Sequence, residues 1–409
     1  MSRILPILST ILLCCATIFP QARLSDDELR HKAVRLAHEF IIVDGHVDIP
    51  YRLHRRYEDI SRRTARGDFD YVRAREGGLD APFMSVYIPS ELENKGAKAL
   101  ADSLIDMVEG FQKAWPDKFA VAASVDAVRS QFAKGLISLP MGMENGSPLE
   151  GKIENVKYFY DRGIRYITLT HAEDNHICDS SYDTTRTWKG LSPFGRQVVQ
   201  EMNRLGIMVD VSHISDDAFY QVMEIAKAPV IASHSSCRHF TPGFERNMSD
   251  EMIELLAKNG GVILINFGSS FLSKEYLDKE KPVWDEVRAY LRKNKLRFGD
   301  PKAEAYIKEV RQKHDFKNVD ISAVADHIDH VVQLVGVDHV GFGSDFDGVG
   351  ESLPVGLEDA SKYPNLIYLL LKRGYSDEEI RKMCGENALR AWAQVEKMAT
   401  ELQGKQSSR

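Results

Sequence analysis

Residues able to bind metals follow a series of short apolar runs in this chain. The first such stretch is VDGHVDIP, residues 43 to 50, which places His46 and Asp48 directly behind an apolar run. One His-x-Asp triplet is weak evidence, because a lone histidine after a strand is usually structural. Later runs, however, end in polar side chains in the same way: Glu144 in MGMENG, His171 in TLTH, His213 in DVSH, His234 in ASHS, and Asp345 and Asp347 in GSDFDG.

A shared metal site explains this set better than separate structural roles. Imidazole and carboxylate ligands suit Zn²⁺, and they suit Mn²⁺ or Co²⁺ less well. His46 and Asp48 can hold one ion, His213 and His234 a second, and the two oxygens of Glu144 can bridge them. Two ions about 3.5–4 Å apart can hold a hydroxide and polarise a carbonyl group, since metal binding lowers the pKa of water from ~15.7 to about 7.

The apolar runs themselves indicate the fold. Each is nearly continuous, several are rich in β-branched residues, and helical patterns lie between them, which is typical of parallel strands buried on both faces. Eight such units favour an α/β fold, a (β/α)8 TIM-type barrel, whose strand ends meet at one C-terminal mouth. An open doubly wound sheet is the competing fold. The expected strands are residues 40–44, 83–88, 136–143, 164–170, 206–212, 228–233, 261–267 and 339–345.

The remaining segments divide the chain as follows. The barrel is expected over residues 23–397, with a helical insertion at 268–319 and a polar tail at 398–409. Residues 51–80 are charged and are expected to form loops. One helix has clear end signals, because Ser192 can cap it, Pro193 suits its first turn and Gly206 suits its end.

The N-terminus has the composition of a secretory signal peptide. Arg3 precedes an apolar stretch, and cleavage after Ala22 would remove residues 1–22. The protein is therefore expected to be secreted, periplasmic or at the cell surface. Membrane association would require lipidation at Cys14 or Cys15, and bulky Leu13 argues against the first of these.

Charge and cysteine content exclude two other classes of protein. The formal net charge of −7 over 409 residues argues against nucleic acid as a partner, because phosphate binding needs a basic face. Three cysteines beyond the leader are too few for a disulfide scaffold and would allow one bridge with one thiol left over. They are Cys178, Cys237 and Cys384.

The chain resembles the membrane (renal-type) dipeptidases, peptidase family M19 of the amidohydrolase-like superfamily. The similarity runs from about residue 40 to 395 and is most specific in GLSPFGRQVVQEMNRLGIMVDVSH and VGFGSDFDG. It implies a barrel with two Zn²⁺ per subunit, dipeptide substrates and a homodimer. It also implies one zinc on His46 and Asp48, a second on His213 and His234, and a bridging Glu144.

Further roles follow from the resemblance. His171 matches the histidine that binds substrate and donates to the developing oxyanion. Arg246, in ERNMSDE, matches the arginine that pairs with the terminal carboxylate of the substrate. Asp345 matches the acid that takes the nucleophile's proton and passes it to the leaving amine. Asp347 is the competing candidate for that acid.

The chain departs from the family pattern at the rim of the site. Val47 stands where the family usually has Asn, ENGSP replaces a Gly-Gly-His run, and His176 is expected to be a rim residue. We expect a zinc-dependent dipeptidase that uses a metal-bridging hydroxide on L-L dipeptides and also on L-D dipeptides. The altered ENGSP loop leaves room for a related metallohydrolase of lactams, lactones or N-acyl amino acids. A binding protein without turnover is the non-enzyme alternative.

Overall fold

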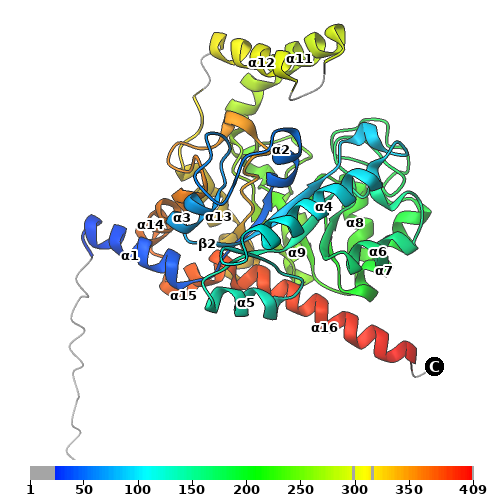
Figure 1. Cartoon of the computed structure of the whole chain (residues 1–409), viewed down its shortest axis with the longest axis horizontal. Helices are drawn as coiled ribbons and strands as arrows, with labels where there is room; N and C mark the ends of the chain where they lie inside the picture. Colours follow the sequence, from blue (N-terminus) through cyan, green and yellow to red (C-terminus); the bar gives the residue numbers. More distant parts are fainter. Residues whose placement is uncertain (1–23, 297–299, 315–316, 408–409) are drawn as a thin grey trace, which may run out of the picture.

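The computed structural model (Figure 1) describes residues 24–296, 300–314 and 317–407. Its main sheet closes into a barrel. Eight parallel strands follow one another around it in the order β1-β10-β9-β8-β7-β6-β5-β2. The expected (β/α)8 barrel is confirmed, and the open sheet is excluded. The strands are β1 (Ile42–Val47), β2 (Leu79–Tyr87), β5 (Met141–Glu144), β6 (Ile164–Thr168), β7 (Met208–Asp210), β8 (Val230–Ser235), β9 (Val262–Ile265) and β10 (Val340–Phe342).

Helices surround the strands and cover their outer faces. The helix with the clearest end signals is α7, which Ser192 caps by accepting from the Gly195 amide and which ends at Gly206 with φ 89°. The helices of the barrel and its termini are α1 (Asp26–Glu39), α4 (Ala97–Ala114), α5 (Val125–Ala133), α6 (Glu154–Asp161), α7 (Pro193–Leu205), α8 (Asp216–Ile225), α9 (Asp250–Lys258), α13 (Ser322–Val335), α14 (Tyr363–Arg373), α15 (Asp377–Arg381) and α16 (Asn387–Ser407).

Two expectations about local structure were wrong. The apolar run 136–143 is not one strand, because it contains β4 (Ile137–Leu139) and β5, separated by Pro140. Proline has no amide N–H and interrupts a strand ladder; β4 pairs instead with β3 (Phe119–Val121) in a separate two-stranded sheet. Residues 51–80 are not merely loops, since they include most of α2 (Ile49–Arg55) and all of α3 (Tyr71–Gly77).

The segment 268–319 adds helices to one side of the barrel. Figure 1 shows α11 (Lys274–Asn294) and α12 (Pro301–Lys313) projecting together beyond the barrel, after the short α10 (Ser269–Leu272). The pair has its own small apolar core, and the rings of Tyr290 and Tyr306 stack with centroids 3.6 Å apart. Residues 398 to 407, expected as a polar tail, continue α16.

Other expectations concern the cysteines and the leader. Cys178, Cys237 and Cys384 are all buried and free, so the bridge that the count allowed is not formed. The leader and both of its cysteines lie outside the described residues. Within 24–296, 300–314 and 317–407, no helix combines the length and apolar character needed to cross a membrane.

The first and last strands close the barrel next to the predicted ligands. The Asp345 amide donates to the His46 carbonyl at 3.0 Å, and the Asp48 amide donates to the Phe346 carbonyl at 2.8 Å. The buried Asp44 carboxylate accepts from the amides of His46 and Ser344. These hydrogen bonds form the seam between β1 and β10. They fix the backbone around His46 and Asp48 beside the turn that follows β10.

Candidate metal centre

The barrel brings the predicted ligands together at the carboxyl ends of its strands. His46 lies in β1, Glu144 is the last residue of β5 and His234 lies in β8. His171 and His213 follow β6 and β7. All five side chains are buried except that of His171, which is 21% exposed, so this imidazole faces the opening of the site.

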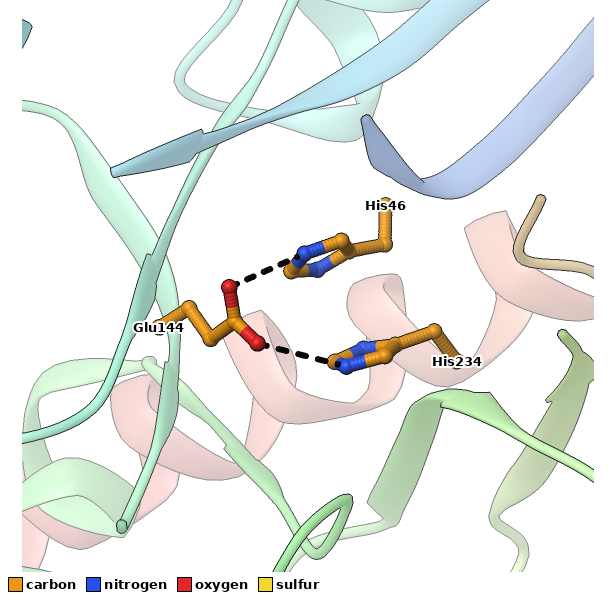
Figure 2. A group of neighbouring side chains, drawn as sticks. All are labelled: His46, Glu144 and His234. Carbon is orange, nitrogen blue, oxygen red and sulfur yellow. Dashed lines mark ion pairs between the residues drawn. The ribbon is translucent and has the colours of Figure 1, made fainter. Parts of the chain in front are cut away.

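Glu144 is the centre of this group, and its two oxygens face different histidines (Figure 2). Glu144 Oε2 lies 3.2 Å from the Nε2 atom of His46. Glu144 Oε1 lies 3.1 Å from His213 Nε2, 3.4 Å from His234 Nε2 and 3.5 Å from His171 Nε2. One carboxylate thus separates the imidazoles into two sets, as a bridging ligand between two cations would.

Several buried ligand atoms in this group have no hydrogen-bond partner. They include His46 Nε2, His213 Nδ1 and Asp48 Oδ1. The Nε2 atoms of His213 and His234 also face each other at 2.8 Å. Buried polar atoms are normally paired. The predicted ligands also fall into three overlapping groups, and within each group one ligand atom per residue lies within 4.8 Å of the others. The donor set therefore fits divalent cations.

Two of the histidines are oriented by hydroxyl groups inside the barrel. The Tyr166 hydroxyl lies 2.8 Å from His46 Nδ1, and the Ser233 hydroxyl lies 2.7 Å from His234 Nδ1. Ser233 in turn donates to Asp210 at 2.6 Å. A hydrogen bond at Nδ1 fixes the ring and directs Nε2 toward a metal.

These supporting residues were not predicted from the sequence. Tyr166 is the one residue with a hydroxyl-bearing ring inside the apolar run IRYITLT, which is the signal that it faces a polar group within the barrel. Asn266, directly after β9, was also missed; its amide donates to Asp345 Oδ2 at 2.8 Å. It is the polar residue at the end of the seventh expected strand, so the strand-end pattern could have found it.

Asp345 and Asp347 have different surroundings. Asp345 lies in one group with His46 and Asp48. Burial raises the pKa of Asp345 to about 7, and the Asp48 carboxylate adds to that effect. Asp347 Oδ2 instead pairs with Arg52 Nε at 2.9 Å, away from the histidines. Of the two, only Asp345 faces the candidate metal centre.

The electrostatics of Glu144, His213 and His234 favour the forms that bind metals. Burial lowers the pKa of both His213 and His234 well below the usual range, and the Arg246 charge acts in the same direction. Burial would raise the pKa of Glu144, but the surrounding imidazoles, with His46 first, hold it well below its usual range. Two neutral imidazoles and an ionised carboxylate can bind a metal without first losing a proton.

Arg246 lies beside this group with unused hydrogen-bonding capacity. The residue is 3% exposed. Its guanidinium donates to the Ser235 hydroxyl at 2.7 Å and to the His234 carbonyl at 2.8 Å, and has no partner at Nε. Tyr182, which the sequence did not single out, lies at the opening with its ring 5.9 Å from that of His213. His176 takes no part, since its Nδ1 pairs with Glu93 at 2.9 Å.

Comparison with known proteins agrees with this architecture. The model of the membrane dipeptidase family (peptidase family M19) matches residues 30–406. Dipeptidase 3 of Mus musculus is 33% identical over 383 residues, which cover 91% of this chain and 68% of that protein. An uncharacterized dipeptidase of Schizosaccharomyces pombe is 33% identical over 374 residues, or 87% of this chain and 81% of that one.

A solved structure extends the likeness to three dimensions. The probable dipeptidase PvdM from Pseudomonas aeruginosa is 25% identical and has a TM-score of 0.76, with 91% of this chain and 100% of that chain covered. The family match spans every strand of the barrel and every candidate ligand. The chain therefore belongs to the membrane dipeptidase family of metallopeptidases, peptidase family M19.

Proposed function

We propose that this protein is a zinc-dependent dipeptidase with two Zn²⁺ per subunit that hydrolyses dipeptides of L-L and also of L-D configuration. The observation that carries the proposal is the position of Glu144, whose Oε2 faces His46 and whose Oε1 faces His213 and His234. His46 and Asp48 would hold one ion, His213 and His234 the other, with Glu144 shared. When bound, two such ions supply a nucleophile at neutral pH and polarise the scissile carbonyl.

The protein's own side chains would orient the substrate. Arg246 has a free Nε beside the group and suits the terminal carboxylate of a dipeptide, because a guanidinium binds carboxylates in a bidentate manner. His171, the more exposed imidazole, would donate a hydrogen bond to the carbonyl oxygen as negative charge develops on it. Both contacts favour a short substrate whose carboxylate lies near the reacting bond.

Asp345 would carry the proton between the attack of the nucleophile and the departure of the amine. Its carboxylate lies next to Asp48 and His46 and accepts from Asn266, so its position is fixed. It would take a proton from the nucleophile and deliver it to the departing amine nitrogen.

A substrate panel with metal control tests the proposal. We expect hydrolysis of L-L and L-D dipeptides that stops after complete chelation and returns with Zn²⁺, and we expect Glu144→Ala to abolish it. Undiminished activity in the metal-free protein, or in Glu144→Ala, would refute the proposal. Turnover of lactams, lactones or N-acyl amino acids in place of dipeptides would identify the alternative hydrolase, and binding without turnover would identify a binding protein.

Two further properties are proposed from the sequence. Secretion after cleavage near Ala22 predicts a mature N-terminus that mass spectrometry of the expressed protein can detect. A homodimer, which the family resemblance implies, predicts twice the chain mass in light scattering of the purified protein.

A further inference from the structure

A second group of metal-binding side chains lies apart from the barrel mouth and shares no residue with it. His239 comes from the 3-10 turn Arg238–Phe240, Asp250 is the first residue of α9, and His330 lies on α13. One potential ligand atom of each side chain lies within 4.8 Å of the others. His239 is exposed and the other two are half-buried, so the group is open to solvent.

The three side chains are already arranged toward one another. His330 Nε2 lies 2.8 Å from Asp250 Oδ1, and the rings of His239 and His330 stack with centroids 4.3 Å apart. Two imidazoles and a carboxylate form a ligand set typical of Zn²⁺.

A third histidine fixes the turn to α13 without any cation. His327 is buried, accepts from the Cys237 amide at its Nδ1 at 3.0 Å, and has its Nε2 3.2 Å from the Leu272 carbonyl. Burial lowers the pKa of His327 to about 3, so it is neutral at ordinary pH. Because His327 ties the start of the turn to the helix that carries His330, His239 and His330 are held at a preset spacing.

We propose that His239, Asp250 and His330 form a peripheral Zn²⁺ site. Zinc bonds of 2.0–2.1 Å in a tetrahedron place ligand atoms roughly 3.3 Å apart. The Asp250 and His330 atoms, now 2.8 Å apart, would therefore separate slightly, and the atoms that lie within 4.8 Å would approach by at most about 1.5 Å. The exposed His239 can make that movement by rotating its side chain. Three protein ligands leave the fourth position to water or a small anion.

A cation at this site would connect the segment between β8 and α9 to α13. That segment also carries Arg246, which contacts the β8 residues Ser235 and His234. The site would therefore stabilise the part of the chain that positions Arg246. The proposal concerns binding and stability, and it does not depend on which substrate the barrel mouth takes.

Zinc counting in the full protein tests the site. The wild type would be dialysed to equilibrium against buffers of nanomolar to micromolar free Zn²⁺, and zinc per chain measured by mass spectrometry. We expect the wild type to bind one zinc more than His239→Ala and than Asp250→Asn. His31→Ala, which removes an exposed histidine from α1, is the matched control and should bind as much as the wild type.

Thermal unfolding in the same buffers gives a second measurement. We expect micromolar Zn²⁺ to raise the melting temperature of the wild type and of His31→Ala by more than that of His239→Ala, because each additional ion that binds only the folded state adds to its stability. Equal zinc content in the wild type and both site variants would overturn the proposal. An equal loss of zinc in His31→Ala would overturn it as well.

Discussion

Asp345 and Asp347 stand two residues apart in the turn after β10, and both have left-handed backbone conformations, with φ 62° and 67°. The same turn directs their carboxylates to different partners. Asp345 accepts from Asn266 at the mouth. Asp347 pairs with Arg52 and accepts from the Asp68 amide at 2.7 Å. We therefore assign Asp347 to holding the turn and Asp345 to proton transfer.

Substitution of each aspartate should separate these roles. We expect Asp345→Asn to lower kcat by about 10²–10⁴-fold with little change in KM, because an amide cannot carry the proton. Asp347→Asn should keep most of kcat but lower the free energy of unfolding by about 2–4 kcal/mol, since it removes the nearer of the two carboxylates that face the Arg52 guanidinium, the other being Glu58 at 3.6 Å. Steady-state kinetics and urea denaturation measure both; similar losses of kcat in the two variants would contradict the assignment.

Arg246 offers a test from the substrate side. Arg246→Lys should raise KM for dipeptides by roughly 10–100-fold, because an ammonium group cannot reproduce a bidentate contact to a carboxylate. A dipeptide whose carboxylate is capped as an amide is the matched control, and its kcat/KM should be nearly the same for both proteins. Equal losses on the free and capped substrates would show that Arg246 acts on the metal centre and not on the carboxylate.

Individual residues differ in how far the sequence could predict them. The candidate ligands lie at the ends of strands or directly after them, so the barrel topology alone was enough to collect them at one mouth. Tyr166 lies inside a strand, and its ring reaches His46 because Gly142 on the neighbouring strand leaves the space. Such packing between strands depends on their register, which the sequence does not display.

At the scale of the elements, the barrel strands could be predicted from the sequence. Each lies in a nearly continuous apolar run, which is typical of parallel strands buried on both faces. The small sheet of β3 and β4 was not, since β3 has three residues and β4 lies in the same apolar run as β5. The helix α3 was also missed. Its signals are local, namely Asp70, which accepts from the Arg73 amide, and Gly78 with φ 76°, and they stand within a stretch too charged to show an apolar face.

The contact between β5 and β6 predicts how one methyl group added at Gly142 would affect stability and metal binding. A Cβ atom at Gly142 would lie 1.9 Å from the Tyr166 ring, so Gly142→Ala should push that ring away from His46. We expect a loss of roughly 1–3 kcal/mol in the free energy of unfolding and about 10–100-fold weaker metal binding. Gly110→Ala is the control, since nothing lies within 4 Å of a Cβ atom there and α4 should gain slightly. Unchanged zinc affinity in Gly142→Ala would contradict the role of Tyr166.

At the scale of the whole molecule, one buried carboxylate far from the mouth should govern part of the pH dependence of stability. Asp80, in the second position of β2, accepts from the Ile42 amide at 3.2 Å, and Arg75 lies 3.7 Å away. Burial raises the pKa of Asp80 to about 7. The folded protein thus holds this proton more tightly than the unfolded chain, whose aspartate pKa is about 3.9.

The direction of this pH dependence follows from the difference between the folded and unfolded pKa values of Asp80. The stabilising contribution of protonated Asp80 is fully present below about pH 4 and is lost as the pH rises through about 7. Asp80→Asn should therefore gain about 1–3 kcal/mol of stability relative to the wild type between pH 5 and pH 8. Urea denaturation at the two pH values measures this, and a constant difference between the proteins would contradict it.

The seam between β1 and β10 has a consequence for how the protein is made. The Ser344 amide and the Asp44 carboxylate that meet there are 300 residues apart in the chain. On the ribosome, His46 and Asp48 emerge early, whereas Asp345 arrives only when most of the chain has been synthesised. A nascent chain therefore carries these two candidate ligands long before Asp345, the proposed proton carrier, and the barrel can close beside them only after β10 has been translated.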